Sequence, residues 1–246
     1  MRSRVLLVHS GGFTSRQWRR LGEDLASDHE VLMPDLIGYG AQPRWRVGEP
    51  FHFKQDVDRL ATMIDGEPVH LVGHSYGGLL VMQLALGRQV RSIAVYEPVT
   101  FGVLGEADAD ARAEIGQLGR YVPDASGVDE AWLRGFIDWW QGEGAWARLP
   151  PETQHAFREV GWKLSEEVRT LGANRTSAAQ YATITAPVLV LGGTQSPPAE
   201  RRVIERLAAA LPYATLTLFP EMGHMGPITH GAKVNATIAA HVRLHN

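Results

Sequence analysis

The sequence predicts an α/β fold, in which a mostly parallel central sheet is flanked by helices and carries a helical cap insertion. Three observations support this prediction. Short apolar runs rich in β-branched residues alternate with amphipathic segments along most of the 246 residues. Such alternation of strand and helix is typical of a parallel sheet covered on both faces. Residues 102–182 interrupt the alternation, because this stretch has helical character and no clear strand.

The strands and helices of the sheet region follow from local sequence patterns. Six apolar runs predict strands buried on both faces, at 5–8, 31–35, 69–73, 92–97, 187–193 and 214–220. The segments between them predict helices at 16–27, 53–64, 76–86 and 198–211. The last of these helices opens with prolines and ends before Pro212, which matches the preferences of helix ends.

The chain length suits one domain with a sizeable insertion. We predict a core domain formed by residues 1–101 and 183–246, with residues 102–182 as a helical cap, or lid. Five of the seven tryptophans fall in this insertion, at positions 132, 139, 140, 146 and 162. They indicate a mostly apolar pocket, although packing between helices explains any single tryptophan equally well. In Trp139-Trp140, one ring is expected to pack and its neighbour to lie on another face.

The amino-acid composition limits the binding partners and the cellular compartment that we expect for this protein. The net charge of −3 predicts no attraction to nucleic acid or to an anionic membrane. The absence of cysteine excludes disulfides, thiolate metal sites and a cysteine nucleophile, and it fits a reducing compartment. The apolar run near the start is too short for a signal peptide, and no run approaches a membrane span. We expect a soluble, cytoplasmic protein with a small-molecule substrate as its partner. The sequence indicates no oligomeric state.

The stretch Gly73-His74-Ser75-Tyr76-Gly77 has the form G-x-S-x-G between an apolar strand and an apolar helix. A nucleophile on a sharp strand-to-helix turn needs small residues two positions away on each side, and Gly73 and Gly77 meet this need. Ser75 is therefore the predicted nucleophile. The alternative is an ordinary glycine-containing turn between a strand and a helix.

Two other loops supply the expected partners of Ser75. His9-Ser10-Gly11-Gly12 follows the first strand, and we expect the backbone N–H groups of Gly11 and Tyr76 to form the oxyanion hole. His224 lies on a loop after the last strand and is the predicted base. His230 is the alternative base, although it suits the start of the final helix better. His9 is expected to brace its turn, and His241 and His245 are expected to face solvent.

These motifs together resemble the α/β-hydrolase superfamily. The resemblance covers residues 1–101 and 183–246, through "HSGG", "MPDLIGYG", "GHSYGG", "YEP" and "EMGHMGP". It implies a hydrolase without cofactor or metal that uses Ser75 as nucleophile and His224 as base. It also implies a loop-organising role for Asp35. Two positions depart from the family pattern: Ser10 replaces a common glycine, and Ser196 stands where the family usually carries its acid.

A serine hydroxyl can orient an imidazole but cannot balance its positive charge, so the triad acid is expected at another position. Glu97 ends the strand that follows the nucleophile's helix, and crossover rules place that strand beside the strand of Ser75. Some family members carry the acid after this strand. We therefore predict Glu97 as the acid and Ser196 as a supporting residue hydrogen-bonded to it. The rival acids are Glu200, Asp35 and Glu221.

The predicted activity is that of a carboxylesterase-like serine hydrolase. Its substrate would be a small, largely apolar ester, thioester or lactone, cleaved through an acyl-enzyme at Ser75. A perhydrolase or a carbon–carbon bond hydrolase remains open, because both can use a serine core. A non-hydrolytic small-molecule receptor on the same fold is the alternative outside enzymes.

Overall fold

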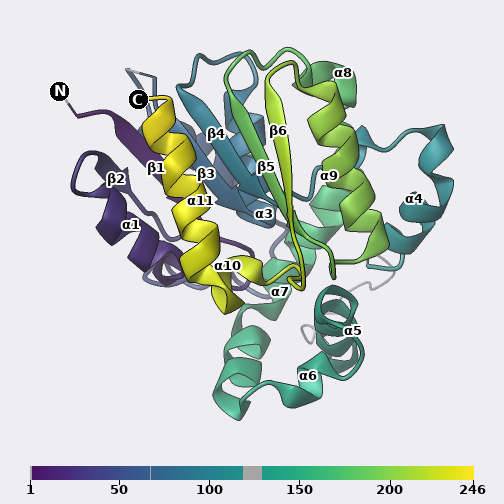
Figure 1. Ribbon diagram of the computed structural model, residues 1–246. Helices are drawn as coiled ribbons and strands as arrows, with labels where there is room; N and C mark the ends of the chain where they lie inside the picture. Colours follow the sequence, from purple (N-terminus) through teal and green to yellow (C-terminus); the bar gives the residue numbers. More distant parts are fainter. Residues whose placement is uncertain (1, 67, 119–128) are drawn as a thin grey trace.

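The computed structural model describes residues 2–66, 68–118 and 129–246. Its centre is a six-stranded, all-parallel sheet with the order β2-β1-β3-β4-β5-β6 (Figure 1). The strands are β1 (Arg4–Val8), β2 (Glu30–Leu32), β3 (His70–His74), β4 (Ser92–Tyr96), β5 (Val188–Gly193) and β6 (Ala214–Phe219). The predicted parallel central sheet is therefore confirmed.

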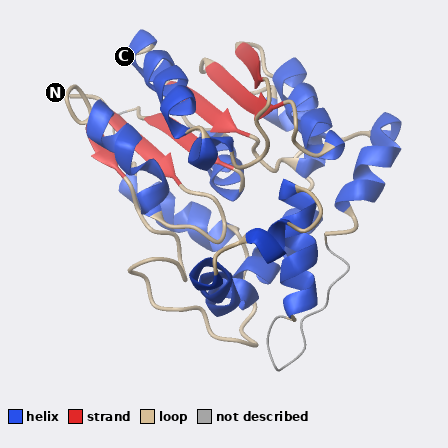
Figure 2. Ribbon diagram, turned by 60° about the horizontal axis from the view of Figure 1, so that its bottom comes forward, coloured by secondary structure: helices blue, strands red, loops and turns tan. Residues whose placement is uncertain are grey.

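Helices cover both faces of the sheet (Figure 2). Side chains of α1 (Arg19–Leu25) and α11 (Gly231–Leu244) join the core on one face. Those of α2 (Lys54–Met63), α3 (Tyr76–Ala85) and α9 (Pro198–Ala210) join the core on the other. The short helices η1 (Ser15–Trp18) and α10 (Gly226–Thr229) precede α1 and α11.

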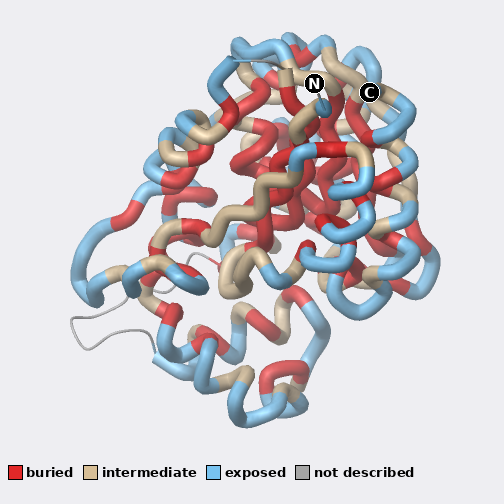
Figure 3. Tube along the Cα trace, turned by 90° about the vertical axis from the view of Figure 1, so that its left-hand side faces the viewer, coloured by how far each residue is buried: buried red, intermediate tan, exposed pale blue. Residues whose placement is uncertain are grey.

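The central strands are buried on both faces, as the apolar runs predict. In β1, Leu6 and Val8 enter one core while Val5 and Leu7 enter the other. The prediction of two buried faces is wrong for the edge strands: β2 is partly exposed, and Leu218 of β6 is 39% exposed. Edge strands have a neighbour on one side only, so less of their surface is covered. Figure 3 shows the buried residues concentrated in the middle of the molecule.

Between β4 and β5, every helix or strand among the described residues is a helix, and loops connect these helices. It contains η2 (Phe101–Val103), η3 (Glu106–Asp108), α4 (Ala109–Ile115), α5 (Glu130–Gln141), α6 (Ala145–Arg148), α7 (Pro151–Ala173) and α8 (Ala178–Tyr181). Residues 119–128 of the predicted cap lie outside the described residues. Helices α5 and α6 lie beyond the end of the sheet from which β3 leads into α3 (Figure 1). Among the described helices, none has the length and apolar character needed to cross a membrane.

Candidate active site

Ser75 lies on a sharp turn between β3 and α3, with a positive φ of 54°. Its two glycine neighbours are required by space. A Cβ at Gly73 would lie 2.4 Å from the carbonyl oxygen of Gly77, and one at Gly77 would lie 2.4 Å from that of Val8. These contacts are too short for any side chain, so the turn depends on both glycines. The strained backbone at Ser75 is of the kind that gathers at functional sites.

His224 contacts both Ser75 and Glu97. Its Nε2 lies 2.9 Å from Ser75 Oγ, and its Nδ1 lies 2.8 Å from Glu97 Oε2. The loop after β6 (Ala214–Phe219) carries this imidazole to the buried floor of the site. The structure therefore brings the predicted nucleophile, base and acid into one hydrogen-bonded chain.

Glu97 directly follows β4, where its φ is 43°. Strand β4 pairs with β3 as predicted, which places this carboxylate beside the turn of Ser75. Its second oxygen, Oε1, accepts hydrogen bonds from the Gly193 N–H at 2.7 Å and from the Ser196 hydroxyl at 2.5 Å. Ser196 thus contacts the carboxylate of Glu97, as expected from the sequence. All three hydrogen bonds hold Glu97 in the orientation that reaches His224.

The rival carboxylates lie in other settings. Glu200 is fully buried, and among the described residues neither of its oxygens has a hydrogen-bond partner. Burial and the nearby charge of Glu97 raise the pKa of Glu200 well above 4.5. Asp35 accepts hydrogen bonds from the backbone N–H groups of Ser15 and Ala41, and so organises its loop. Glu221 is exposed.

The expected oxyanion donors lie at the pocket beside Ser75. Gly11 and Tyr76 both line it, and Tyr76 opens α3, where backbone N–H groups have no partner inside the helix. His9 braces the neighbouring turn, with Nδ1 2.8 Å from the Ser10 carbonyl and Nε2 accepting from the Leu36 N–H. Burial lowers the pKa of His9 to about 4, which keeps it neutral.

His74, inside the serine motif, links the loop after β1 to His224. Its Nε2 lies 2.8 Å from the carbonyl oxygen of His224, which fixes that nitrogen as the donor. Nδ1 then accepts from the Gln17 amide at 3.2 Å, and Gln17 Oε1 accepts from the Ser10 N–H at 3.0 Å. Sequence reasoning did not assign a role to His74 or Gln17, because the partners lie far apart along the chain.

The insertion contributes Trp140, whose ring stacks on His224 with a centroid distance of 3.7 Å. The expectation that one ring of Trp139-Trp140 packs inward did not specify which ring. Helical spacing could have decided this, because Leu133, Ile137 and Trp140 recur at one face of α5 and are all buried. The contact with His224 itself depends on the tertiary structure.

The other histidines considered as bases or as exposed residues do not line the pocket at Ser75. His230 is exposed and stands at the start of α11, as expected. The prediction that His241 and His245 face solvent is wrong, since both are partly buried. Helix α11 packs against β4, which covers part of this helix surface. Burial and the neighbouring His245 lower the pKa of His241 to about 4.

The pocket above Ser75 is mostly apolar and lies between the insertion and the core. Its lining includes Phe13, Val99, Phe101, Phe136, Ile137, Trp140, Phe157 and Leu164, together with Ser75 and His224. One carboxylate, that of Glu167 on α7, also belongs to the lining. An apolar acyl or alcohol group would therefore be accommodated beside the serine.

Several known proteins with related sequences carry hydrolase names, and another is named as the dihydrolipoyllysine-residue acetyltransferase component of an acetoin cleaving system. Lipase LipV of Mycobacterium tuberculosis is 36% identical over 178 residues, which cover 66% of this chain but 62% of that lipase. Esterase YbfF of Escherichia coli is 26% identical over 257 residues, covering 97% of this chain and 91% of the esterase. The putative carbamate hydrolase RutD of Variovorax paradoxus is 28% identical over 246 residues, covering 95% and 89%.

Solved structures share the fold. MenH from S. aureus matches with a TM-score of 0.73 and 18% identity, covering 99% of this chain and 94% of that chain. A meta-cleavage product hydrolase from Pseudomonas fluorescens matches with a TM-score of 0.72 and 20% identity, covering 99% and 92%. A family model described as the alpha/beta hydrolase family matches residues 5–237. Because this match spans nearly the whole sequence, the chain belongs to the alpha/beta hydrolase family.

Proposed function

We propose that this hydrolase cleaves carboxylic esters of small, largely apolar substrates through an acyl-enzyme at Ser75. The observation that carries the proposal is the continuous hydrogen-bonded chain from Ser75 through His224 to Glu97 at the pocket. Thioesters and lactones present the same electrophilic carbonyl and belong to the same substrate class.

The first step forms the acyl-enzyme. Nε2 of His224 takes the proton of Ser75 as Oγ attacks the carbonyl carbon. The backbone N–H groups of Gly11 and Tyr76 stabilise the oxyanion that forms. Glu97 stabilises the resulting imidazolium through Nδ1. The imidazolium then donates its proton to the leaving alcohol, and the carbon–oxygen bond breaks.

The second step returns the enzyme to its starting state. His224 takes a proton from water, the hydroxide attacks the acyl carbon, and Ser75 leaves with the proton restored to Oγ. The insertion serves as a cap over this chemistry, because α5 supplies Trp140 and α7 supplies Leu164 to the pocket wall. Its apolar side chains exclude bulk water from the acyl group.

Carbamate hydrolysis is a second candidate. The relative RutD, named a putative carbamate hydrolase, aligns over 95% of this chain. A carbamate offers the same carbonyl to Ser75, with nitrogen in place of carbon on one side. Because ester and carbamate hydrolysis would use the same catalytic groups, only activity measurements with both kinds of substrate distinguish them.

The test combines a fluorophosphonate probe with p-nitrophenyl esters of short and long acyl chains. The wild type should be labelled and should turn over at least one ester, while Ser75→Ala should do neither. Ligand binding by the wild type without labelling or turnover would favour a receptor and contradict the proposal. A parallel carbamate series would show whether the nitrogen analogue is preferred.

A further inference from the structure

Two of the buried charged side chains of helix α7, those of Lys163 and Glu167, form one cluster beside the pocket. Lys163 and Glu167, one helical turn apart, contact each other, and the Lys163 ammonium also lies 3.0 Å from Asp56 Oδ2. The exposed fractions of these three side chains are 2% or less. Burying a charged side chain is costly unless it is paired. The partners of each charged group in this cluster therefore indicate its role.

The cluster holds two carboxyl groups, those of Asp56 and Glu167, against the single ammonium of Lys163. Asp56 accepts hydrogen bonds from the Ile37 N–H and the Tyr76 hydroxyl in addition to Lys163, so its carboxylate is fully partnered. Asp56 and Lys163 neutralise each other. Glu167 then adds a second carboxylate against the same single ammonium, and burial raises the pKa of Glu167 to about 7. The Asp56–Lys163 pair and the Glu167–Tyr39 hydrogen bond both tie α7 to the core, and Glu167 alone of the two carboxylates also lines the pocket.

Glu167 lies against the loop that is expected to hold the substrate carbonyl. A Cβ built on Gly11 would lie 2.6 Å from its Oε2, and the same oxygen accepts a hydrogen bond from the Tyr39 hydroxyl at 2.9 Å. Tyr39 and Lys163 thus fix the carboxylate at the pocket wall. The neighbouring lining residues Leu164 and Val168 are apolar. A substrate whose carbonyl oxygen reaches the Gly11 N–H would bring its adjacent carbon close to this carboxylate.

We propose that Glu167 is a specificity-determining residue, which accepts a hydrogen bond from a hydroxyl or ammonium group on the carbon next to the scissile carbonyl. Either donor supplies a further hydrogen bond to the Glu167 carboxylate, and an ammonium also supplies a second positive charge to the cluster. The proposal rests on the proposed ester hydrolysis at Ser75 and names its substrate class as hydroxyacyl or aminoacyl esters with an apolar side chain. An unsubstituted ester fits the same pocket but leaves the carboxylate without this partner.

Three methyl esters of equal shape test the proposal: 3-phenylpropanoate, 3-phenyllactate and phenylalanine methyl ester. They carry hydrogen, hydroxyl and ammonium at the carbon next to the carbonyl. After division by the rates of alkaline hydrolysis, kcat/KM should favour one of the substituted esters over the parent by about 10- to 100-fold. A preference for the ammonium alone identifies aminoacyl esters, and one for the hydroxyl alone identifies hydroxyacyl esters.

Two variants assign that preference to Glu167. Glu167→Leu removes the acceptor but leaves Asp56 and Lys163 paired, so the ratio to the parent ester should fall to near one. Glu167→Gln keeps an acceptor oxygen without the charge, so a preference for ammonium should fall while a preference for hydroxyl should persist. The isosteric glutamine variant also serves if the leucine variant does not fold.

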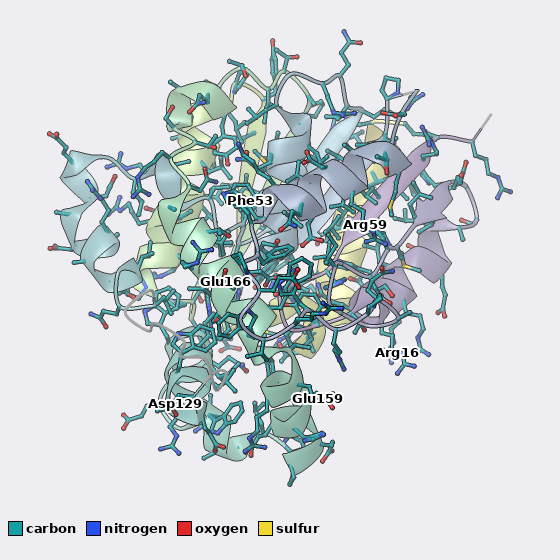
Figure 4. The ribbon with its side chains drawn as sticks, turned by 180° about the vertical axis from the view of Figure 1, so that it is seen from behind. Arg16, Phe53, Arg59, Asp129, Glu159 and Glu166 are labelled. Atoms are coloured by element: carbon teal, nitrogen blue, oxygen red, sulfur yellow. The ribbon has the colours of Figure 1, made fainter. Side chains whose placement is uncertain are left out.

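Glu159 provides a matched control on the same helix. It is exposed, pairs with Arg44 and lies farther from the core than Glu166, the neighbour of Glu167 (Figure 4). Glu159→Leu should leave the substrate ratio unchanged. Two results would overturn the inference about Glu167 without affecting the proposed function. One is a wild type that hydrolyses the parent ester and prefers neither substituted ester by more than about threefold. The other is a preference that survives in Glu167→Leu. Failure of fluorophosphonate labelling and of all ester turnover refutes the proposed function and the inference together.

Discussion

Replacing Glu97 with glutamine should remove a charge and also reverse the hydrogen-bond direction at His224. Oε1 of Glu97 accepts from the Gly193 N–H and from Ser196 Oγ, so the glutamine carbonyl would keep this position. Its amide N–H would then point at Nδ1 of His224, which lies 2.8 Å from the other carboxylate oxygen in the wild type. The imidazole would hold its proton on Nε2, facing Ser75, and could not take the serine proton.

The size of the effect follows from the lost charge pair. Two unit charges about 4 Å apart attract by about 4 kcal/mol at an effective dielectric constant of about 20. Losing this stabilisation of the imidazolium slows the reaction by about 10³-fold. The unfavourable tautomer adds to this, and a triad whose acid becomes an amide loses on the order of 10⁴ in kcat. We therefore expect kcat of Glu97→Gln to fall by a factor on the order of 10³ to 10⁴.

The assay is kcat for a p-nitrophenyl ester, with thermal unfolding followed by circular dichroism. Glu200→Gln is the matched control, because it makes the same change in a buried glutamate that has no hydrogen bond to His224. Ser196→Ala removes one hydrogen bond but keeps the charge of Glu97, and should cost about tenfold or less. If Glu97→Gln folds and keeps kcat within tenfold of the wild type, the role of Glu97 as triad acid is refuted.

Two further predictions concern Trp140 and Glu200. Trp140→Leu removes the ring stacked at 3.7 Å on His224, so the imidazolium of the transition state loses a cation–π contact. Its kcat should fall about 5- to 30-fold with the fold retained, and an unchanged kcat would contradict this. The pKa of Glu200 is raised above 4.5 in the folded state, so the wild type loses stability as pH rises from 4.5 towards that folded value. Relative to the wild type, the free energy of unfolding of Glu200→Gln should rise by up to about 1.4 kcal/mol per pH unit in this window, as measured by denaturant unfolding. If the free energies of unfolding of both proteins change in parallel with pH, Glu200 is not protonated in the folded state.

Most of the fold was predictable because it is encoded locally. The six strands and the helices between them appear near their predicted ranges, since apolar runs and helix-end residues act within a few positions. The error about the edge strands has a nonlocal origin. Burial of β2 and β6 depends on their place in the strand order, which an apolar run does not specify.

The predicted groups of the site also meet in the structure. Ser75, His224 and Glu97 could be selected because each follows a strand, and parallel strands bring their carboxyl ends to one edge. Trp140, His74 and Glu167 received no role from the sequence. Each depends on a contact between elements distant along the chain, and their residue types also suit ordinary helix packing or surface positions.

The sequence by itself determined the sheet, the serine turn and the place of Glu97 directly after the strand next to that turn. These features follow from local periodicity, from the space that two glycines provide, and from the handedness of strand crossovers. Only the tertiary structure decided which carboxylate reaches His224, which tryptophan covers it, and that Glu167 lies at the pocket. Side-chain contacts between α5, α7 and the core are set by how those helices pack, and that packing depends on the whole chain.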